Sequence, residues 1–318
     1  LREALAEMGR RGLLGLRLPP DLGGRGVSPA EFRRFQEASA RASGALAFLE
    51  SQHQSACGLV ARSPNAALRA FLGPRLARGE RTSGIAFSHL RRPGAPLCRA
   101  TPGPGGYVLD GALPWVTGWG LFTDCVTAAT LPDGRTLFVR HDLAASGALS
   151  ASPPLPLAAM SVTQTVTLEA RGLVVPESDV VDVRSADWIR ENDRLAVALQ
   201  SPLALGCAQA GIDVLRARGD AAATEAAARL QSALEAARQQ AYAAMEEPAP
   251  PEKALQARAA AIALAGRCAH AAVVAWAGAG NLADHPAQRV YREALAFSVL
   301  ALTPPIRQAV LEVLSSKF

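Results

Sequence analysis

The chain has 318 residues, 49% of them hydrophobic and 19% charged, which suits a soluble protein with two or three packed units. No stretch reaches the roughly 18 uninterrupted apolar residues of a membrane span, so we expect no membrane partner. The net charge of +5 comes almost entirely from arginines spread singly along the chain, with lysine only at 253 and 317, so we expect no nucleic-acid partner.

The first 82 residues predict an N-terminal α-helical domain. Apolar residues recur at helical spacing up to Gly12, and Ser28 with Glu31 forms the pattern of a capping box before a second helix. The stretch GLLGLRLPPDLGGRG between them is rich in turn residues. The expected helices are 1–11, 28–43, 45–61 and 66–78.

Residues 83–186 predict a middle antiparallel β domain. Apolar and polar residues alternate here, and Pro, Gly and Asp separate the alternating segments, as in strands joined by turns. The run from Val162 to Leu168 alternates cleanly and predicts a half-buried strand. The expected strand segments are 107–120, 125–132, 135–143 and 161–176.

Residues 187–318 predict a C-terminal α-helical bundle. Its expected Ala-rich helices are 189–217, 221–246, 252–277 and 286–301, with a proline-marked connection at 246–253. Helices on both sides of a run of strands, without βαβ alternation, indicate an α+β fold and argue against a Rossmann fold. The glycine-rich stretches GPGGY and GAGNL are therefore weak candidates for phosphate loops.

The five cysteines and five histidines show neither a disulfide pattern nor the spacing of metal ligands. An odd number of cysteines without a CxxC pair is typical of small buried side chains in a reducing compartment. We therefore expect a cytoplasmic protein without a metal site.

Four stretches, taken in order, resemble the acyl-CoA dehydrogenase family of flavoproteins. They are GLLGLRLPPDLGGRG (12–26), YVLDGALPWVTGWG (107–120) with Asp124 after it, TLEARGLVVPES (167–178) and GAGNLADHPAQRVYREA (278–294). The resemblance implies the family's fold of N-terminal helices, β domain and C-terminal bundle. It also implies FAD as the cofactor and oxidation of a C–C bond in an acyl-CoA thioester.

The resemblance assigns five cofactor-binding residues: Trp115, Thr117, Ser88, Thr303 and Gly278. In the family, the Trp and Thr of the β domain contact the flavin ring, and Trp115 and Thr117 match them. Ser88 stands where the family has a Thr in a loop that contacts flavin and thioester. The alternative for Trp115 and Thr117 is a Trp in an ordinary β core beside a β-branched strand residue.

Two features of the family are missing from the sequence. The Arg-x-x-Phe-Gly segment that contacts the FAD diphosphate has no counterpart in RARGDAAATEAAARL (216–230), where only Arg216 or Arg218 offers a charge. The family's catalytic Glu stands in a Glu-Gly-Thr turn, and the count from Arg292 puts that Glu at Ala301 and the Thr at Thr303. Alanine cannot accept the proton that the reaction removes.

Asp193 is the remaining candidate for the catalytic base. Some relatives carry the base on an earlier helix, where Glu191 and Asp193 lie here, and Asp193 precedes Arg194 as the base precedes an Arg in those relatives. The alternative is an acidic first turn that complements the helix dipole.

Three functions follow from these observations. The first is an acyl-CoA dehydrogenase-like oxidoreductase, the second a flavin monooxygenase of the same fold, which does not need the Glu, and the third a non-catalytic scaffold or binding protein. The resemblance further implies acyl-CoA or a related small molecule as the ligand and a homodimer or homotetramer. An electron-transfer flavoprotein is the expected partner under the first function only.

Overall fold

The computed structural model describes residues 1–246 and 250–316, which fall into two compact units. The first unit comprises 1–28, 48–157 and 161–191, and the second comprises 29–47, 158–160 and 192–318. The predicted α+β order of helices, strands and helices is confirmed. The division into three domains stays a prediction, and the predicted connection at 246–253 lies partly outside the described residues.

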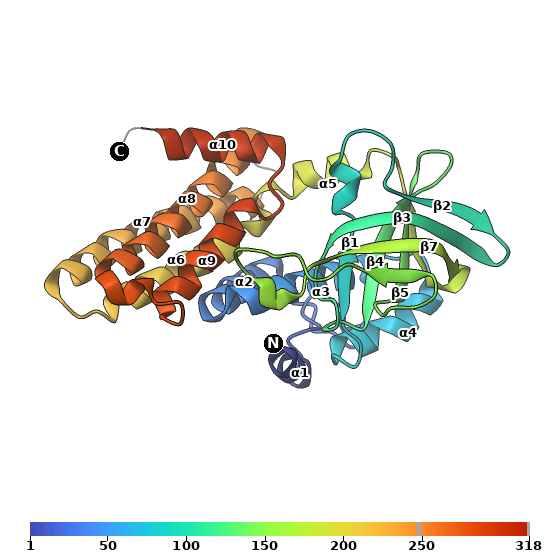
Figure 1. Cartoon of the computed structure of the whole chain (residues 1–318), viewed down its shortest axis with the longest axis horizontal. Coiled ribbons are helices and arrows are strands. Elements are labelled where there is room, and N and C mark those ends of the chain that lie inside the picture. Colours follow the sequence, from blue (N-terminus) through green and yellow to red (C-terminus); the bar gives the residue numbers. More distant parts are fainter. Residues whose placement is uncertain (247–249, 317–318) are drawn as a thin grey trace. The chain divides into compact units, whose positions relative to one another are not determined.

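One eight-stranded sheet forms the centre of the first unit (Figure 1). The strands follow the order β6-β7-β3-β2-β4-β5-β8, and β1 pairs with β4. Most pairs are antiparallel as expected, but β1 and β2 run parallel to β4, so the sheet is mixed. The strands are β1 Ser83–Ala86, β2 Cys98–Gly103, β3 Gly106–Val116, β4 Asp124–Thr130, β5 Thr136–Asp142, β6 Leu149–Ala151, β7 Val166–Pro176 and β8 Val180–Arg184.

The strand expected at 161–176 begins only at Val166. Ser161–Thr163 forms a short 3-10 helix, and Gln164 has a left-handed φ of 53° that breaks the extended backbone. The prediction from Val162 onward was therefore wrong for its first residues. The alternation of apolar and polar residues does not reveal a single left-handed residue. Such a residue ends the extended backbone without changing the apolar–polar pattern of the sequence.

Helices α3 (Gly44–Ala61) and α4 (Ala66–Ala77) pack against the sheet through their apolar side chains. Asn65 begins α4, and its side-chain oxygen accepts the N–H of Leu68 at 3.0 Å. The remaining helices of this unit are α1 (Arg2–Arg10) and the start of α5 (Trp188–Leu195). The buried cluster between helices and sheet contains Ala56, Cys57, Val60, Leu68, Leu72, Leu76, Val126, Ala128, Phe138 and Val181.

Asp124 holds the start of β4 through two arginines. Its carboxylate is fully buried and accepts two hydrogen bonds from Arg81, at 2.6 and 2.8 Å, and one from Arg140 at 2.5 Å. The hydroxyl of Thr123 adds a fourth hydrogen bond at 2.7 Å. Each donor offsets part of the hydration that this buried carboxylate loses on folding, so loss of one arginine would leave a buried charge poorly compensated.

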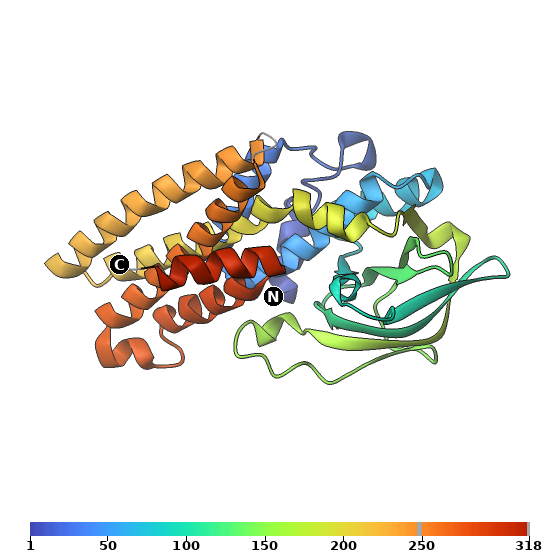
Figure 2. The ribbon, with the colours of Figure 1, turned by 90° about the horizontal axis from the view of Figure 1, so that it is seen from above.

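The second unit is a helical bundle centred on α6 (Figures 1 and 2). The helix expected at 189–217 is divided in the structure into α5, a 3-10 turn at Val197–Gln200 and α6. The helix α10 was not expected from the sequence; it follows the Thr-Pro-Pro break and begins with the two prolines. The helices are α2 Pro29–Ala42, α6 Ser201–Arg216, α7 Ala221–Glu246, α8 Pro251–Ala275, α9 Pro286–Val299 and α10 Pro304–Ser315.

Two glycines let neighbouring helices approach α6 closely. A Cβ on Gly206 would lie 2.2 Å from the carbonyl oxygen of Glu37 in α2, and one on Gly211 would lie 2.8 Å from the carbonyl carbon of Cys268 in α8. Both distances are too short for any side chain, so both positions need glycine for packing. An ion pair also joins α2 to α6, with Arg41 bound to Asp213 at 2.6 Å.

The helix α8 is long and apolar enough, by length and composition, to cross a membrane. In the structure, 61% of its apolar stretch is buried inside the protein. Such burial is typical of a core helix of a soluble protein, where an all-round apolar helix is covered by its neighbours. The expectation of no membrane partner stays a prediction.

Candidate functional site

Trp115 lies in a bulge of β3 and presents its ring to solvent. The register between β3 and β7 shifts between Leu113 and Val116, and within that shift Trp115 has a left-handed φ of 62°. Its side chain is 52% exposed, whereas Val116 beside it is fully buried. The bulge therefore turns a large aromatic ring out of the sheet, so Trp115 is not the ordinary core tryptophan of the alternative reading.

Thr117 follows the bulge and is buried. Its hydroxyl forms a hydrogen bond of 2.9 Å with the hydroxyl of Thr165, which is also buried. The backbone N–H of Gly118 donates to the carbonyl of Thr163 at 2.9 Å, and that of Trp119 donates to Gln164 at 3.1 Å. These bonds tie the segment after the bulge to the segment before β7 and hold Thr117 in place.

Ser88 braces the same bulge from the loop after β1. Its hydroxyl donates to the carbonyl of Pro114 at 3.0 Å, directly before Trp115. The structure thus brings Ser88, Trp115 and Thr117 together in the first unit, and their role as cofactor-binding residues stays a prediction. His89, which the sequence did not single out, is buried beside Ser88, and burial lowers its pKa to about 4. Neither of its ring nitrogens has a hydrogen-bond partner among the described residues.

Gly278 lies in the short 3-10 helix Ala277–Asn281 of the second unit. Nothing lies within 4 Å of the position that a Cβ would take there, so packing does not demand a glycine. Gly280 differs, because a Cβ on it would lie 2.5 Å from the carbonyl oxygen of Val273. The open backbone at Gly278 is compatible with close approach of a ligand.

Ala301 and Thr303 lie together between α9 and α10. Ala301 is exposed and has a left-handed φ of 49°, and its carbonyl accepts the N–H of Thr303 at 3.1 Å. Thr303 begins α10 but its hydroxyl does not cap the helix. The segment expected to carry a catalytic carboxylate is thus a tight turn with a methyl group at the expected position.

Asp193 lies on α5 and is half-buried. The only acidic residue in the first turn of that helix is Glu191, so the complement to the helix dipole accounts for Glu191 and not for Asp193. Asp193 is therefore placed where a carboxylate is not required for the start of the helix.

Glu293, the last acidic residue before the α9–α10 turn, is engaged elsewhere. Its carboxylate is buried, accepts the N–H of Gly44 at 2.8 Å and pairs with Arg289 at 2.7 Å. Burial raises its pKa, while Arg289 and the N–H groups at the start of α3 lower it. Glu293 thus caps a helix and does not supply the carboxylate that the resemblance leads one to expect near Ala301.

The connection between α6 and α7 offers no group suited to a diphosphate. Arg216 donates to Gln231 at 3.1 Å, and Arg218 lies 3.5 Å from Asp220 and 5.7 Å from the ring of Trp276. The connection is only four residues long, 217–220, and contains no aromatic residue. A cation engaged by a carboxylate in the same turn is poorly available for a phosphate.

A buried polar cluster on α3 was not expected from the sequence. Glu50, His53 and Cys57 follow one another at helical spacing, and all three are fully buried. The sulfur of Cys57 lies 3.4 Å from Nε2 of His53, whose Nδ1 accepts the N–H of Ser83 at 3.1 Å. Burial raises the pKa of Glu50 to about 8 against the lowering effects of Gln54 and Arg17, and burial lowers the pKa of His53 to about 4.

All five cysteines are buried as free thiols, three in the first unit and two in the second. Burial is the main cause that raises the pKa of each, to about 12 for Cys98, Cys125 and Cys268. No group of three or more His, Cys, Asp and Glu side chains among the described residues could hold a metal ion.

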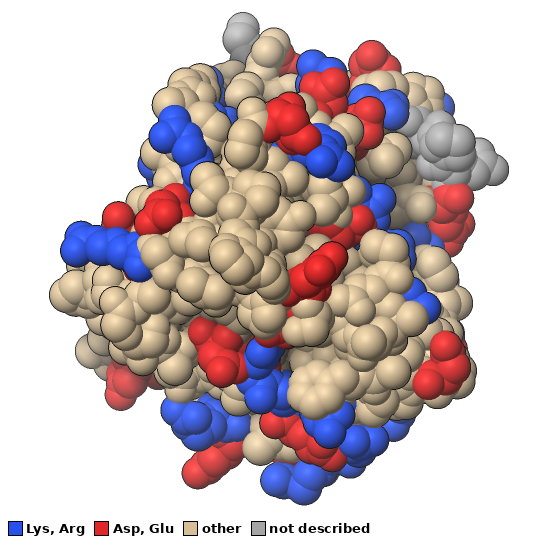
Figure 3. Space-filling model, turned by 90° about the vertical axis from the view of Figure 1, so that its right-hand side faces the viewer, with Lys and Arg blue, Asp and Glu red and all other residues tan. Residues whose placement is uncertain are grey.

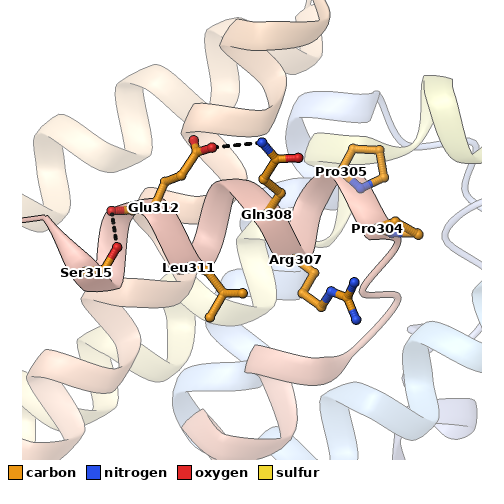
Figure 4. A pocket seen from close by; sticks show the side chains of 7 residues that line it. All are labelled: Pro304, Pro305, Arg307, Gln308, Leu311, Glu312 and Ser315. Atoms are coloured by element: carbon orange, nitrogen blue, oxygen red, sulfur yellow. Dashed lines mark hydrogen bonds between the residues drawn. The ribbon is translucent and has the colours of Figure 1, made fainter.

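The depression along α10 is not lined by the candidate residues, and the charges on the face drawn in Figure 3 form no extended basic patch. A shallow depression of about 580 Å³ lies along one side of α10 (Figure 4) and is lined by Pro304, Pro305, Arg307, Gln308, Leu311, Glu312 and Ser315. It contains none of the residues that the resemblance implicates, and we assign it no catalytic role. On the face shown in Figure 3, Lys and Arg alternate with Asp and Glu, without one extended basic patch.

Residues 1–80 match the family model described as the N-terminal domain of acyl-CoA dehydrogenase. Among solved structures, a probable acyl-CoA dehydrogenase from Mycobacterium abscessus is 17% identical, with 99% of this chain and 91% of that chain covered and a TM-score of 0.85. FkbI, for biosynthesis of the methoxymalonyl extender unit of a polyketide, is 20% identical (100% and 94% covered, TM-score 0.84). A glutaryl-CoA dehydrogenase from Mycobacterium smegmatis in complex with FADH2 is 16% identical (100% and 87% covered, TM-score 0.81). No curated protein matches the chain.

Proposed function

We propose that this chain, which has the acyl-CoA dehydrogenase fold and carries that family's N-terminal domain in residues 1–80, is a flavin-dependent oxidoreductase that acts on an acyl thioester. The proposal rests on Trp115. A tryptophan that is 52% exposed forgoes about half of the stabilisation that its burial would give, and its left-handed backbone costs about 1–2 kcal/mol more. Both costs are explained if the ring covers a bound aromatic cofactor.

The residues of the first unit suit the flavin ring of FAD. The residues of the second unit suit the diphosphate of FAD less well. Trp115 offers an exposed aromatic face, and Thr117 offers a fixed hydroxyl whose position Thr165 sets. In the second unit, Gly278 and Thr303 offer an open backbone and a hydroxyl that caps no helix. A diphosphate would have to be bound without the α6–α7 connection. When bound, FAD supplies an acceptor for hydride.

The chain itself must supply a group that takes the proton from the carbon next to the thioester. Ala301 cannot do this, and Glu293 caps α3. We therefore propose Asp193 as the base, because it is half-buried and its helix does not require it for capping. Asp193 would take the α proton, and the β hydrogen would leave the substrate as a hydride, for which bound FAD would be the acceptor.

The same resemblance suggests the substrate class, the oligomeric state and the electron acceptor of the proposed enzyme. FkbI belongs to the biosynthesis of an acyl building block, and the dehydrogenases named above act on CoA thioesters by their names, so an acyl thioester is the substrate class. We propose a cytoplasmic homodimer or homotetramer, with an electron-transfer flavoprotein as the acceptor of its electrons.

Binding of FAD is the first test. The purified protein should be yellow or should become so with added FAD, and Trp115→Ala should weaken FAD binding at least tenfold. Val174→Ala is a matched control, because Val174 is 66% exposed on β7 of the same sheet and lies outside the proposed site. A protein that does not bind FAD would contradict the proposal and favour the non-catalytic scaffold.

Reduction by substrate is the second test. Under anaerobic conditions, short-chain and dicarboxylic acyl-CoA esters should bleach the flavin absorbance, and Asp193→Asn should slow bleaching at least a hundredfold while FAD stays bound. Bleaching by NAD(P)H with oxygen consumption, and none by acyl-CoA, would favour the monooxygenase instead. That outcome would fit the absence of a carboxylate at Ala301.

A further inference from the structure

Arg258 is a buried cation without a carboxylate partner among the residues that the structure describes. It lies on α8, is 1% exposed, and is among the largest fully buried side chains of the chain. Burial lowers its pKa to about 10, so it stays charged at neutral pH. A charge in such a place is costly unless it does something that an apolar side chain cannot do.

The one hydrogen bond that the guanidinium makes within the described residues goes to the α9–α10 turn. Nη2 of Arg258 donates to the carbonyl oxygen of Leu300 at 3.1 Å, while Nε and Nη1 have no partner there. Leu300 ends α9 with an extended backbone, and the left-handed Ala301 follows it directly. The buried charge is thus attached to the turn at the residue before its strained position.

Two side chains of this turn also pack in the second unit, Leu300 against the main apolar cluster of the bundle and Leu302 against a smaller one. One backbone bond crosses the turn, from the N–H of Thr303 to the carbonyl of Ala301. Beyond it, α10 packs on α8 through a small apolar cluster of Ala259, Ile262, Ile306 and Val310. An alanine with φ of 49° costs about 1–2 kcal/mol relative to a right-handed conformation, so each restraint on its neighbours helps the turn to keep this conformation.

The start of α6 supplies acceptors at the same level of the bundle as Arg258. The helices α6 and α8 run in the same direction, because the short connections make α7 antiparallel to both, and Gly211 lies against Cys268 (Figure 1). Counting back ten residues on each helix pairs Ser201 with Arg258. Oγ of Ser201 is buried without a partner in the described part of the chain, as is Oε1 of Gln200 before it. These oxygens are the type of group that a buried water would link to Nε and Nη1.

We propose that Arg258 is a positioning residue that holds the α9–α10 turn, and with it Ala301 and Thr303, in the conformation seen here. In the proposed enzyme, this is the turn at which the resemblance expects the catalytic base. The effect of Arg258 on turnover therefore rests on the proposed function. The positioning itself does not, since it concerns only the backbone of 300–303.

Hydrogen exchange of the peptide that covers 300–306 tests the positioning without reference to catalysis. Arg258→Met removes the donor and should speed exchange of the Thr303 amide about tenfold, the factor expected for loss of one hydrogen bond of ~1.4 kcal/mol. Arg258→Lys keeps one donor and should restore part of the protection. Arg229→Met, which changes an exposed arginine of α7, should leave this peptide unchanged.

A double-mutant cycle with Ala301→Gly gives the sharper readout. Glycine adopts a left-handed φ without strain, so the turn should then need Arg258 less, and Arg258→Met should speed exchange only about threefold or less. An equal effect of Arg258→Met with Ala301 and with Gly at 301, or faster exchange throughout the second unit with none specific to 300–306, would overturn the proposal.

If the variants also turn over acyl-CoA, the two proposals separate. A loss of turnover in Arg258→Met that Arg258→Lys rescues, with FAD affinity unchanged, would support both. Altered exchange in a protein that never binds FAD would support the positioning and refute the proposed function.

Discussion

Replacement of Glu50 by glutamine should remove a large pH dependence from the stability of the first unit. Glu50 is fully buried on α3, and its carboxylate oxygens have no hydrogen-bond partner among the described residues. Burial raises its pKa from 4.5 to about 8, with Gln54 and Arg17 acting in the opposite direction. The folded protein therefore holds Glu50 protonated at neutral pH, whereas the unfolded chain does not.

The sign and size follow from proton linkage. Because the pKa is raised on folding, the stability contributed by the protonated carboxyl is fully present below pH 4.5 and is lost as the pH rises to about 8. Each tenfold change in proton affinity corresponds to ~1.4 kcal/mol, so the loss between pH 5 and pH 9 is about 4 kcal/mol. Glutamine has the same shape and does not titrate, so Glu50→Gln should be spared this loss.

Equilibrium unfolding in guanidinium chloride at pH 5, 7 and 9 measures the difference. The free energy of unfolding of Glu50→Gln should exceed that of the wild type by about 4 kcal/mol more at pH 9 than at pH 5. The subtraction removes the titration of other groups, and Glu225→Gln, on the exposed side of α7, serves as the control. Parallel pH profiles of wild type and Glu50→Gln would refute the reasoning.

Three further outcomes follow from the same structure. Gly280→Ala should destabilise the protein by about 2 kcal/mol or more in thermal unfolding, because the new Cβ would lie 2.5 Å from the carbonyl oxygen of Val273. Gly278→Ala should leave the stability unchanged, and equal shifts of the melting temperature in the two variants would contradict the geometry. Glu293→Ala should lower the free energy of unfolding by about 2–3 kcal/mol, because the N–H of Gly44 and the guanidinium of Arg289 lose their buried partner. A change in denaturation midpoint near zero would show that water replaces the carboxylate. In the Glu50→Gln variant, which lacks the opposing titration of Glu50, the unfolding free energy should fall below pH 6.5. Burial lowers the pKa of His53 to about 4, so the stability that its neutral state contributes is present above pH 6.5 and is lost towards pH 4. A flat profile of this variant between pH 6.5 and pH 4 would exclude the effect.

The sequence predicted the fold because its signals are carried by many residues at once. Helical spacing before 82 and after 187, and alternation between them, determine the type of most elements, and single errors average out. The mixed pairing of β1 and β2 with β4 was missed, since alternation is the same in parallel and antiparallel strands that have one buried face.

The sequence singles out candidate residues only where a motif carries them. The family motif points to Trp115, and its assignment to a cofactor site stays a prediction. The left-handed backbone of Trp115 depends on the register with β7, which no local pattern encodes. Arg258 lies in an Ala-rich helix where a lone arginine looks like a solvated charge, and its burial arises from packing with α6 and α9. Likewise Glu50 and His53 look like the polar face of a helix, and only the fold encloses them.

The reaction rates of the five buried thiols report how often each unit opens locally. Each thiol must leave its enclosed position, and must ionise against a raised pKa, before it can react with a thiol reagent. Alkylation of the native protein should therefore be slow and limited by opening, and mass spectrometry of the labelled peptides would time the opening of each unit separately. Cys57, Cys98 and Cys125 report on the first unit, and Cys207 and Cys268 report on the second. No residue has to be introduced to follow whether a ligand closes one unit, the other, or both.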